Sequence, residues 1–65
     1  MYTVIDEIHI EDYIILKLDK GIVEKKYTKY VIDGKEFNIV PIYDAKQCIA
    51  IKAKGSYINK KVNVI

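Results

Sequence analysis

Isoleucine and valine together supply 19 of the 65 residues, whereas leucine occurs only twice, as Leu16 and Leu18. β-Branched side chains lose rotamer freedom against the preceding turn of a helix, but they fit the pleated surface of a sheet. Leucine, the large apolar residue that helices favour, is nearly absent. Six tyrosines and one phenylalanine strengthen the same preference. The composition therefore predicts a small all-β protein.

The length limits what such a protein can contain. Residues 1–65 are enough for a single domain near the lower limit of independent folding. Its free energy of unfolding should be about 3–10 kcal/mol, scaled from the usual value per residue. Because a core of this size is one layer of side chains thick, a deep enzyme cleft is not expected. About half the residues are apolar and 31% are charged, which is the balance of a globular chain.

The same composition bears on where the protein works. No apolar run approaches the roughly 18 residues that span a bilayer, and Asp6 and Glu7 precede any basic residue, unlike in a secretion signal. Cys48 is the only cysteine, which excludes an internal disulfide and a cysteine-based zinc site. We therefore expect a cytoplasmic protein that makes no membrane contact and uses no cofactor or metal ion.

Charge is distributed unevenly along the chain. Residues 1–24 hold six acids and two lysines, a balance of −4, and residues 25–65 hold nine lysines and three acids, a balance of +6. A basic half can indicate a nucleic-acid-binding face or an acidic partner. All eleven basic residues are lysines, and the lack of arginine argues against direct reading of bases.

Alternation predicts the first strands. Over residues 2–10 the apolar side chains fall mostly on even positions, which predicts a strand with Tyr2, Val4, Ile8 and Ile10 on its buried face. After a break at residues 11–12, a second strand follows at 13–18, and its apolar residues on both faces favour a central position. A turn comes next at 19–21, where Gly21 is free to adopt positive φ.

The sharpest local signal is the pair Asp33-Gly34 between two β-rich runs. This pair is typical of a two-residue hairpin in which both central residues need positive φ. The second arm of the hairpin is expected over residues 36–43. Pro41 lies inside that arm, and because proline cannot donate to a ladder, we expect it at an edge or a bulge.

Residues 44–54 are ambiguous. Asp44 could cap a helix that Gly55 ends, but the alternation at 48–54 favours a turn at 44–47 followed by a strand, with one helical turn near 44–48 as the remaining helical alternative. A last strand is expected at 58–65. Five to seven short strands in so small a chain predict a closed or partly open antiparallel β-barrel.

The stretch Tyr30-Val31-Ile32-Asp33-Gly34-Lys35-Glu36-Phe37, with Gly55-Ser56-Tyr57-Ile58-Asn59-Lys60-Lys61-Val62 further on, resembles the β-barrel second domain of elongation factor Tu and related translational GTPases. The resemblance covers about residues 10–65. It implies a barrel fold and a role in docking on RNA or protein surfaces. It brings no nucleotide chemistry, since this chain has no GTPase domain, and fold alone does not fix function.

Three candidate catalytic or metal-binding features have a structural explanation that we favour. His9 is the only histidine, and nothing in the sequence supplies it with a nucleophile or a base. Cys48 begins an apolar run, as a small core residue would, although Lys46 two residues away could activate a thiolate. The acids Asp6, Glu7, Glu11 and Asp12 match no calcium loop and are expected to be solvated.

Lysines interleaved with tyrosine are the remaining candidate site. Small barrels hold single-stranded nucleic acid with basic groups along the phosphates and aromatic rings under the bases, although lysines also protect sheet edges from aggregation. The residues considered for such a face are Lys52, Lys54, Tyr57, Lys60 and Lys61.

The overall expectation is a non-catalytic interaction module that docks on a protein partner or a larger assembly, with RNA binding through the lysine and tyrosine face as the alternative. Pairing of subunits is compatible with so small a core, and no small-molecule substrate is indicated. Docking on a protein would need an exposed apolar patch, which the sequence suggests around Tyr43 or Tyr57.

Overall fold

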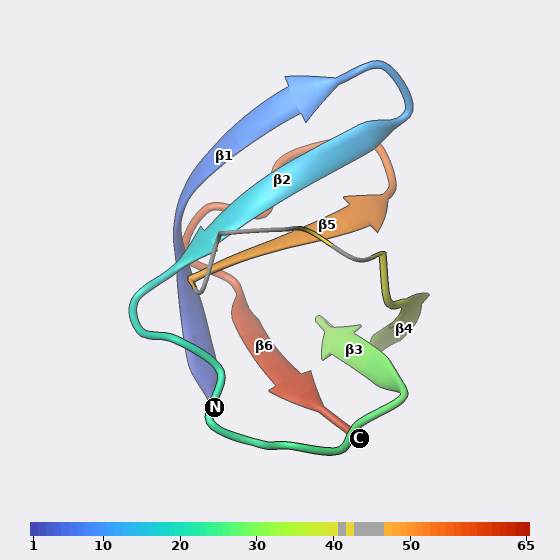
Figure 1. Cartoon of the computed structure of the whole chain (residues 1–65). Helices are drawn as coiled ribbons and strands as arrows, with labels where there is room; N and C mark the ends of the chain where they lie inside the picture. Colours follow the sequence, from blue (N-terminus) through green and yellow to red (C-terminus); the bar gives the residue numbers. More distant parts are fainter. Residues whose placement is uncertain (41, 43–46) are drawn as a thin grey trace.

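The computed structural model describes residues 1–40, 42 and 47–65. Over these residues the chain forms six antiparallel strands in one sheet and no helix (Figure 1). The all-β prediction and the expected number of strands are confirmed. The order across the sheet is β4-β3-β6-β1-β2-β5. The strands are β1 (Tyr2–Ile10), β2 (Tyr13–Leu18), β3 (Lys29–Ile32), β4 (Lys35–Asn38), β5 (Cys48–Lys52) and β6 (Lys61–Val64).

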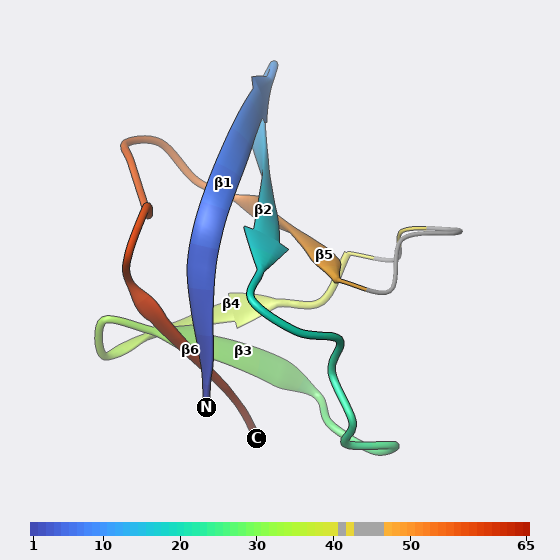
Figure 2. The same ribbon diagram turned by 90° about the vertical axis from the view of Figure 1, so that its left-hand side faces the viewer.

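The sheet curls into a partly open barrel. Strands β4 and β5 are the two ends of the sheet, and a single antiparallel bridge between Val40 and Ala50 joins the segment after β4 to β5. In Figure 2 the strands β3, β4 and β6 cross beneath β1, β2 and β5. The edges that an open six-stranded sheet would expose are thereby brought close together.

The core lies inside this curl and contains both leucines. Leu16 and Leu18 are fully buried, because their side chains face the inside of the curl. β2 lies between β1 and β5, as its apolar sequence predicted. Tyr27, Phe37 and Tyr57 pack against the rim of the core. The buried cluster consists of Tyr2, Val4, Ile14, Leu16, Leu18, Tyr30, Ile32, Ile49, Ile51 and Val62.

A β-bulge in β1 changes which side chains face the core. Val4 lies opposite Leu18 and Asp6 lies opposite Lys17, so Ile5 is an extra residue on the β1 side. One extra residue shifts the alternation by one position, and every later side chain moves to the other face. The predicted burial of Ile8 and Ile10 is therefore wrong, since 57% and 50% of these residues are exposed.

The turns follow the sequence signals with one exception. Asp33 and Gly34 have φ of 55° and 79°, as the two-residue hairpin requires. Gly21, in contrast, does not adopt positive φ, and the chain continues as a long connection until β3 begins at Lys29. The chain does bend at Asp19 and Lys20, as expected, but without a positive φ at Gly21.

Several expected strands are shorter in the structure. The second hairpin arm ends at Asn38, β5 ends at Lys52, and the last strand begins only at Lys61. Gln47 lies in a turn and Cys48 begins β5, so the strand prediction from residue 48 is confirmed. The expectations for Pro41, for Tyr43 and for a helical turn near 44–48 fall wholly or mainly on residues outside the described part of the chain.

Candidate interaction surface

Beyond the bulge, residues 6–10 of β1 pair with residues 13–17 of β2, and we call this part of the sheet the β1–β2 ribbon. Its tip lies at the end of the molecule away from both termini (Figures 1 and 2). Ile8 lies directly opposite Ile15, and Ile10 lies opposite Tyr13. Directly opposite residues share a face of the sheet and touch one another. We call the resulting surface, formed by Ile8, Ile10, Tyr13 and Ile15, the outer apolar face.

The side chains of the outer apolar face are neighbours, and three of the four are exposed to solvent, whereas Ile15 is half-buried. Ile8 and Ile10 are at least half exposed, and Tyr13 is 39% exposed. Single exposed apolar residues are ordinary on protein surfaces, but a contiguous group marks a contact site more often. The sequence suggested an apolar patch around Tyr43 or Tyr57. Tyr57 instead packs against the core and is not part of such a patch.

Charged side chains border the outer apolar face. At one end, Asp6 lies opposite Lys17 across the ribbon, and at the other end Lys52 of β5 lies opposite Tyr13. Between them Ile15 has the small Ala50 as its neighbour on β5. An apolar centre with a charged rim is the usual composition of a protein–protein contact.

The outer half of β1 also presents a free backbone edge. Strand β6 pairs with β1 only at Tyr2 and Thr3, and Val4 adds backbone hydrogen bonds to Lys60 (3.0 Å) and Asn59 (2.9 Å). At Asn59, whose φ is 68°, the chain turns away. Within the described residues no strand continues alongside residues 7–10 on that side.

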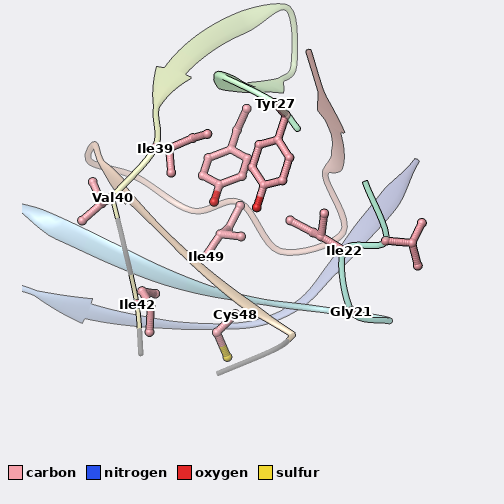
Figure 3. Close-up of a pocket in the computed structure, with 10 residues that line it drawn as sticks. Gly21, Ile22, Tyr27, Ile39, Val40, Ile42, Cys48 and Ile49 are labelled. Carbon is pink, nitrogen blue, oxygen red and sulfur yellow. The ribbon is translucent and has the colours of Figure 1, made fainter. Parts of the chain in front are cut away.

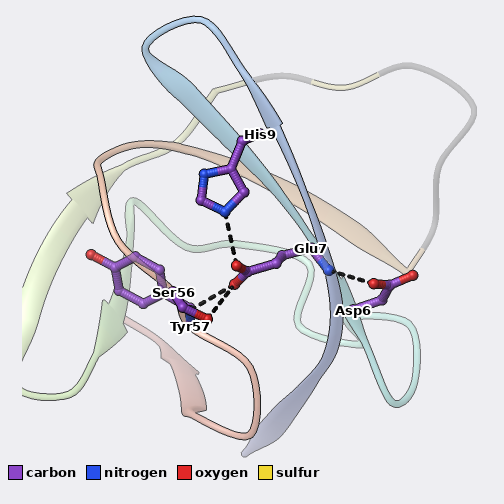
Figure 4. A network of polar contacts seen from close by, with 5 residues as sticks. All are labelled: Asp6, Glu7, His9, Ser56 and Tyr57. Carbon is purple, nitrogen blue, oxygen red and sulfur yellow. Dashed lines mark hydrogen bonds and ion pairs between the residues drawn. The ribbon is translucent and has the colours of Figure 1, made fainter.

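On the inner side of the ribbon, Glu7 holds together two distant parts of the chain (Figure 4). Its carboxylate accepts hydrogen bonds from the Tyr57 backbone N–H (2.7 Å), the Ser56 hydroxyl (3.2 Å) and Nε2 of His9 (2.8 Å). The Glu7 side chain is 13% exposed, whereas His9 is 51% exposed. The bonds from His9 and Tyr57 hold the pKa of the Glu7 carboxyl below its usual range.

These residues do not have the geometry of a hydrolytic triad. In such a triad the histidine lies between the nucleophile and the carboxylate and removes the proton of the nucleophile. Here the Glu7 carboxylate lies between Ser56 and His9 and accepts a hydrogen bond from each of them. The serine hydroxyl therefore donates to the carboxylate and not to the histidine, unlike in a triad. In the described part of the chain, no three or more histidine, cysteine or acidic side chains gather as metal ligands.

A pocket with a volume of about 490 Å³ lies at one mouth of the barrel. The side chains of Ile22, Tyr27, Ile39 and Ile49 converge on it (Figure 3). None of the described residues that line it is charged. Tyr30 also lines it, and burial raises the pKa of its hydroxyl above the ordinary value of 10.0. Over residues 1–40, 42 and 47–65, the lining offers hydroxyl groups for hydrogen bonding but no acid–base pair.

Cys48 lies at the rim of this mouth and is half-buried. It is not part of the buried cluster, so a core position for Cys48 is not confirmed. Lys46, the residue that could activate the thiol, is outside the described residues.

The structure places the five residues of the predicted nucleic-acid face in two separate regions. Lys52 lies beside Tyr13 near the tip of the ribbon, and Lys61 lies beside Thr3 at the other end of β1. At the rise of an extended strand these two ends are about 20 Å apart. Lys54 is exposed just beyond β5.

The other members of that set have contacts within the chain. Lys60 is 3.4 Å from a carboxylate oxygen of Asp33, and Lys61 donates to the Thr3 hydroxyl at 2.8 Å. The Tyr57 ring packs edge-on against Phe37, with 5.9 Å between the ring centres. Tyr57 therefore offers less free ring surface for base stacking than an unpacked aromatic side chain.

No helix in the described residues is long and apolar enough to cross a membrane. No protein-family model, curated protein or solved structure matches this chain, so the resemblance to the translational GTPase barrel stays a prediction.

Proposed function

We propose that this protein is a non-catalytic interaction module that docks on a protein partner through the outer apolar face of the β1–β2 ribbon. The observation that carries the proposal is the exposure of Ile8 and Ile10 directly opposite Ile15 and Tyr13. Placing these side chains in water costs free energy that burial against a partner recovers, at about 25 cal/mol for each Å² of apolar surface.

The bulge at Ile5 supports this proposal. Without the bulge, the alternation of the sequence would turn Ile8 and Ile10 toward the core. Bulges often re-aim side chains next to functional sites. The charged rim formed by Asp6, Lys17 and Lys52 suits a partner with an apolar centre and polar surroundings.

Two polar features, the hydrogen bonds of Glu7 and the mouth of the barrel, support a non-catalytic role in this proposal. Glu7 is saturated with hydrogen bonds that join β1 to the loop before β6, which is a structural task. The mouth lined by Tyr27 and Tyr30 offers hydroxyl groups, and its lining within the described part of the chain includes no charged side chain.

The test is photo-crosslinking from the outer apolar face in the cells that produce the protein. A photoreactive phenylalanine analogue replaces Tyr13, and we expect one discrete protein adduct after irradiation. Adding Ile8→Thr and Ile10→Thr should abolish the adduct, because threonine keeps the β-branched shape but removes apolar surface. Val23→Thr is the matched control, since Val23 is 79% exposed and lies outside the ribbon.

Two results would contradict the proposal. One is an adduct that survives the Ile8→Thr and Ile10→Thr pair, because docking would then not use this face. The other is an adduct that nuclease removes, accompanied by RNA-induced NMR shifts at Lys52, Lys54 and Lys60 that fade between about 50 and 200 mM salt. That outcome would favour the RNA-binding alternative.

A further inference from the structure

We propose that a second copy of this chain pairs with the free edge of β1, antiparallel to it, about a twofold axis that passes beside Ile8. This inference deepens the proposed function, because pairing would join the two copies into one continuous sheet, with the outer apolar faces of the two ribbons side by side and β5 of each copy beyond its β2. It uses the backbone edge of the ribbon, whereas docking on the partner uses its face.

Backbone geometry identifies the groups available for this pairing. A two-residue turn joins β1 to β2, so Ile10 exchanges both of its backbone hydrogen bonds with its neighbour on β2. Ile8 does the same, and the alternation directs the N–H and C=O of Glu7 and His9 to the opposite, free edge. An observed bond agrees with this assignment: the Glu7 N–H donates to the side chain of Asp6 at 2.8 Å.

Nothing in the described chain blocks access to that edge. Figure 2 looks onto it, and no other described segment crosses in front of the upper half of β1. The His9 side chain, on the inner side of the ribbon, is 51% exposed. The protection at this edge is small, because the Asp6 side chain covers one N–H group and leaves the N–H and C=O of His9 to solvent.

Charge selects one register for the pair. When Glu7 of each copy lies opposite His9 of the other, four backbone hydrogen bonds form, and Ile8 lies against Ile8 on the axis. Moving the register toward the N-terminus sets Glu7 against Glu7, and like charges directly opposite are unfavourable. Moving it toward the tip sets Glu7 against Glu11, which lies in the turn with φ of 54°. A self-complementary register is what a second copy requires, and an unrelated strand would not need it.

The dimensions of the molecule support association. Its accessible surface is 4689 Å², whereas a compact monomer of this mass is expected to expose about 4300 Å². Domains of this size often gain stability by pairing subunits. In the pair, the Glu7 N–H leaves the Asp6 side chain for a carbonyl of the second copy, so no donor is lost.

The first test is sedimentation over a concentration series. We expect the average mass to rise from one chain toward two, and His9→Pro to weaken association by about tenfold or more, since proline removes one outward N–H from each copy. His9→Thr is the matched control that keeps the N–H, and it should still associate. Melting curves check that both variants fold. A wild-type chain that stays monomeric throughout, or a His9→Pro variant that associates as well as His9→Thr, would overturn the inference.

A disulfide test defines the register. In a Cys48→Ser background, Ile8→Cys should form a covalent dimer on mild oxidation, because the Cα atoms of such a pair lie about 4.5 Å apart, within disulfide range. Ile10→Cys is the control, since its two copies would be about 13 Å apart. Equal cross-linking of both variants would exclude the register.

The two proposals can fail separately. A monomeric chain that still gives the protein adduct from position 13 removes the pairing and leaves the docking function. A chain that forms the dimer but gives no protein adduct from position 13 removes the docking function and leaves the pairing.

Discussion

At the scale of single residues, the sequence predicted that the Glu7 carboxylate is solvated, whereas in the structure it accepts three hydrogen bonds from within the chain. It lies among acids at 6, 7, 11 and 12, and this pattern alone indicates an exposed strand end. The structure instead buries most of its side chain and provides three donors, two of which come from a loop about 50 residues later. No local pattern could reveal a contact at that separation, because it depends on how the sheet curls.

The hydrogen bonds of Glu7 make a specific prediction for the dependence of stability on pH. Because these bonds hold the pKa of the folded carboxyl below its ordinary value of 4.5, the ionised form stabilises the fold. This contribution is fully present above pH 4.5 and is lost as the pH falls through the lowered pKa. Glu7→Gln should lower the melting temperature by a few degrees at pH 7 and flatten the decline in acid.

The measurement is the urea midpoint of the wild type and of Glu7→Gln between pH 7 and pH 3. The two curves should converge as the pH falls. Asp12→Asn is the control, since Asp12 is an exposed acid in the turn between β1 and β2. Curves that stay parallel over the whole range would show that Glu7 does not have this role.

At the scale of elements, the sequence predicted the pieces whose cause is local. The Asp33-Gly34 turn is correct because positive φ at both positions is a property of those two residues. The apolar run of β2 correctly indicated a central strand. The bulge at Ile5 could not be predicted in this way, since its cause is the packing of both Val4 and Glu7 toward the inside. One missed residue therefore reversed the expected facing of Ile8 and Ile10.

The hairpin turn between β3 and β4 can be tested by Gly34→Ala. Gly34 has φ of 79°, and an added methyl group would meet no neighbouring atom within 4 Å. The whole effect should therefore be backbone strain, about 1–2 kcal/mol of unfolding free energy. Chemical denaturation measures it. Asp33→Asn is the control and should cost only a few tenths of a kcal/mol, because Asn-Gly also favours this turn. Equal losses for the two variants would contradict the assignment of strain to Gly34.

At the scale of the whole molecule, the number of strands and the presence of a barrel-like curl could be predicted, because a short chain rich in β-branched residues must hide its edges. The location of the interaction surface could not. Sequence reasoning followed the lysines and tyrosines, whereas the structure divides them between two ends of β1 and packs Tyr57 against Phe37. A surface is a property of the folded sheet, and its apolar residues look like core residues until their facing is known.

The last prediction compares a leucine that faces the core with an isoleucine that faces solvent. Leu16 is fully buried at the centre of β2, so Leu16→Ala should cost about 2–5 kcal/mol. That is a large part of the roughly 3–10 kcal/mol expected for the chain, and much of the variant should be unfolded. Ile8→Thr, at a residue 57% exposed, should change the unfolding free energy by about 0.5 kcal/mol or less in dilute solution.

The measurement is urea denaturation of the wild type, Leu16→Ala and Ile8→Thr at the same low protein concentration. It also tests the interaction surface. Simple alternation would place Ile8 in the core, so it predicts similar losses for Ile8→Thr and Leu16→Ala. The bulge predicts that only Leu16→Ala is severe. If Ile8→Thr is severe in dilute solution, Ile8 is covered within the single chain and cannot form a docking face. If it is mild there and its cost grows with protein concentration, the same side chain is buried by a second copy, as the twofold pairing requires.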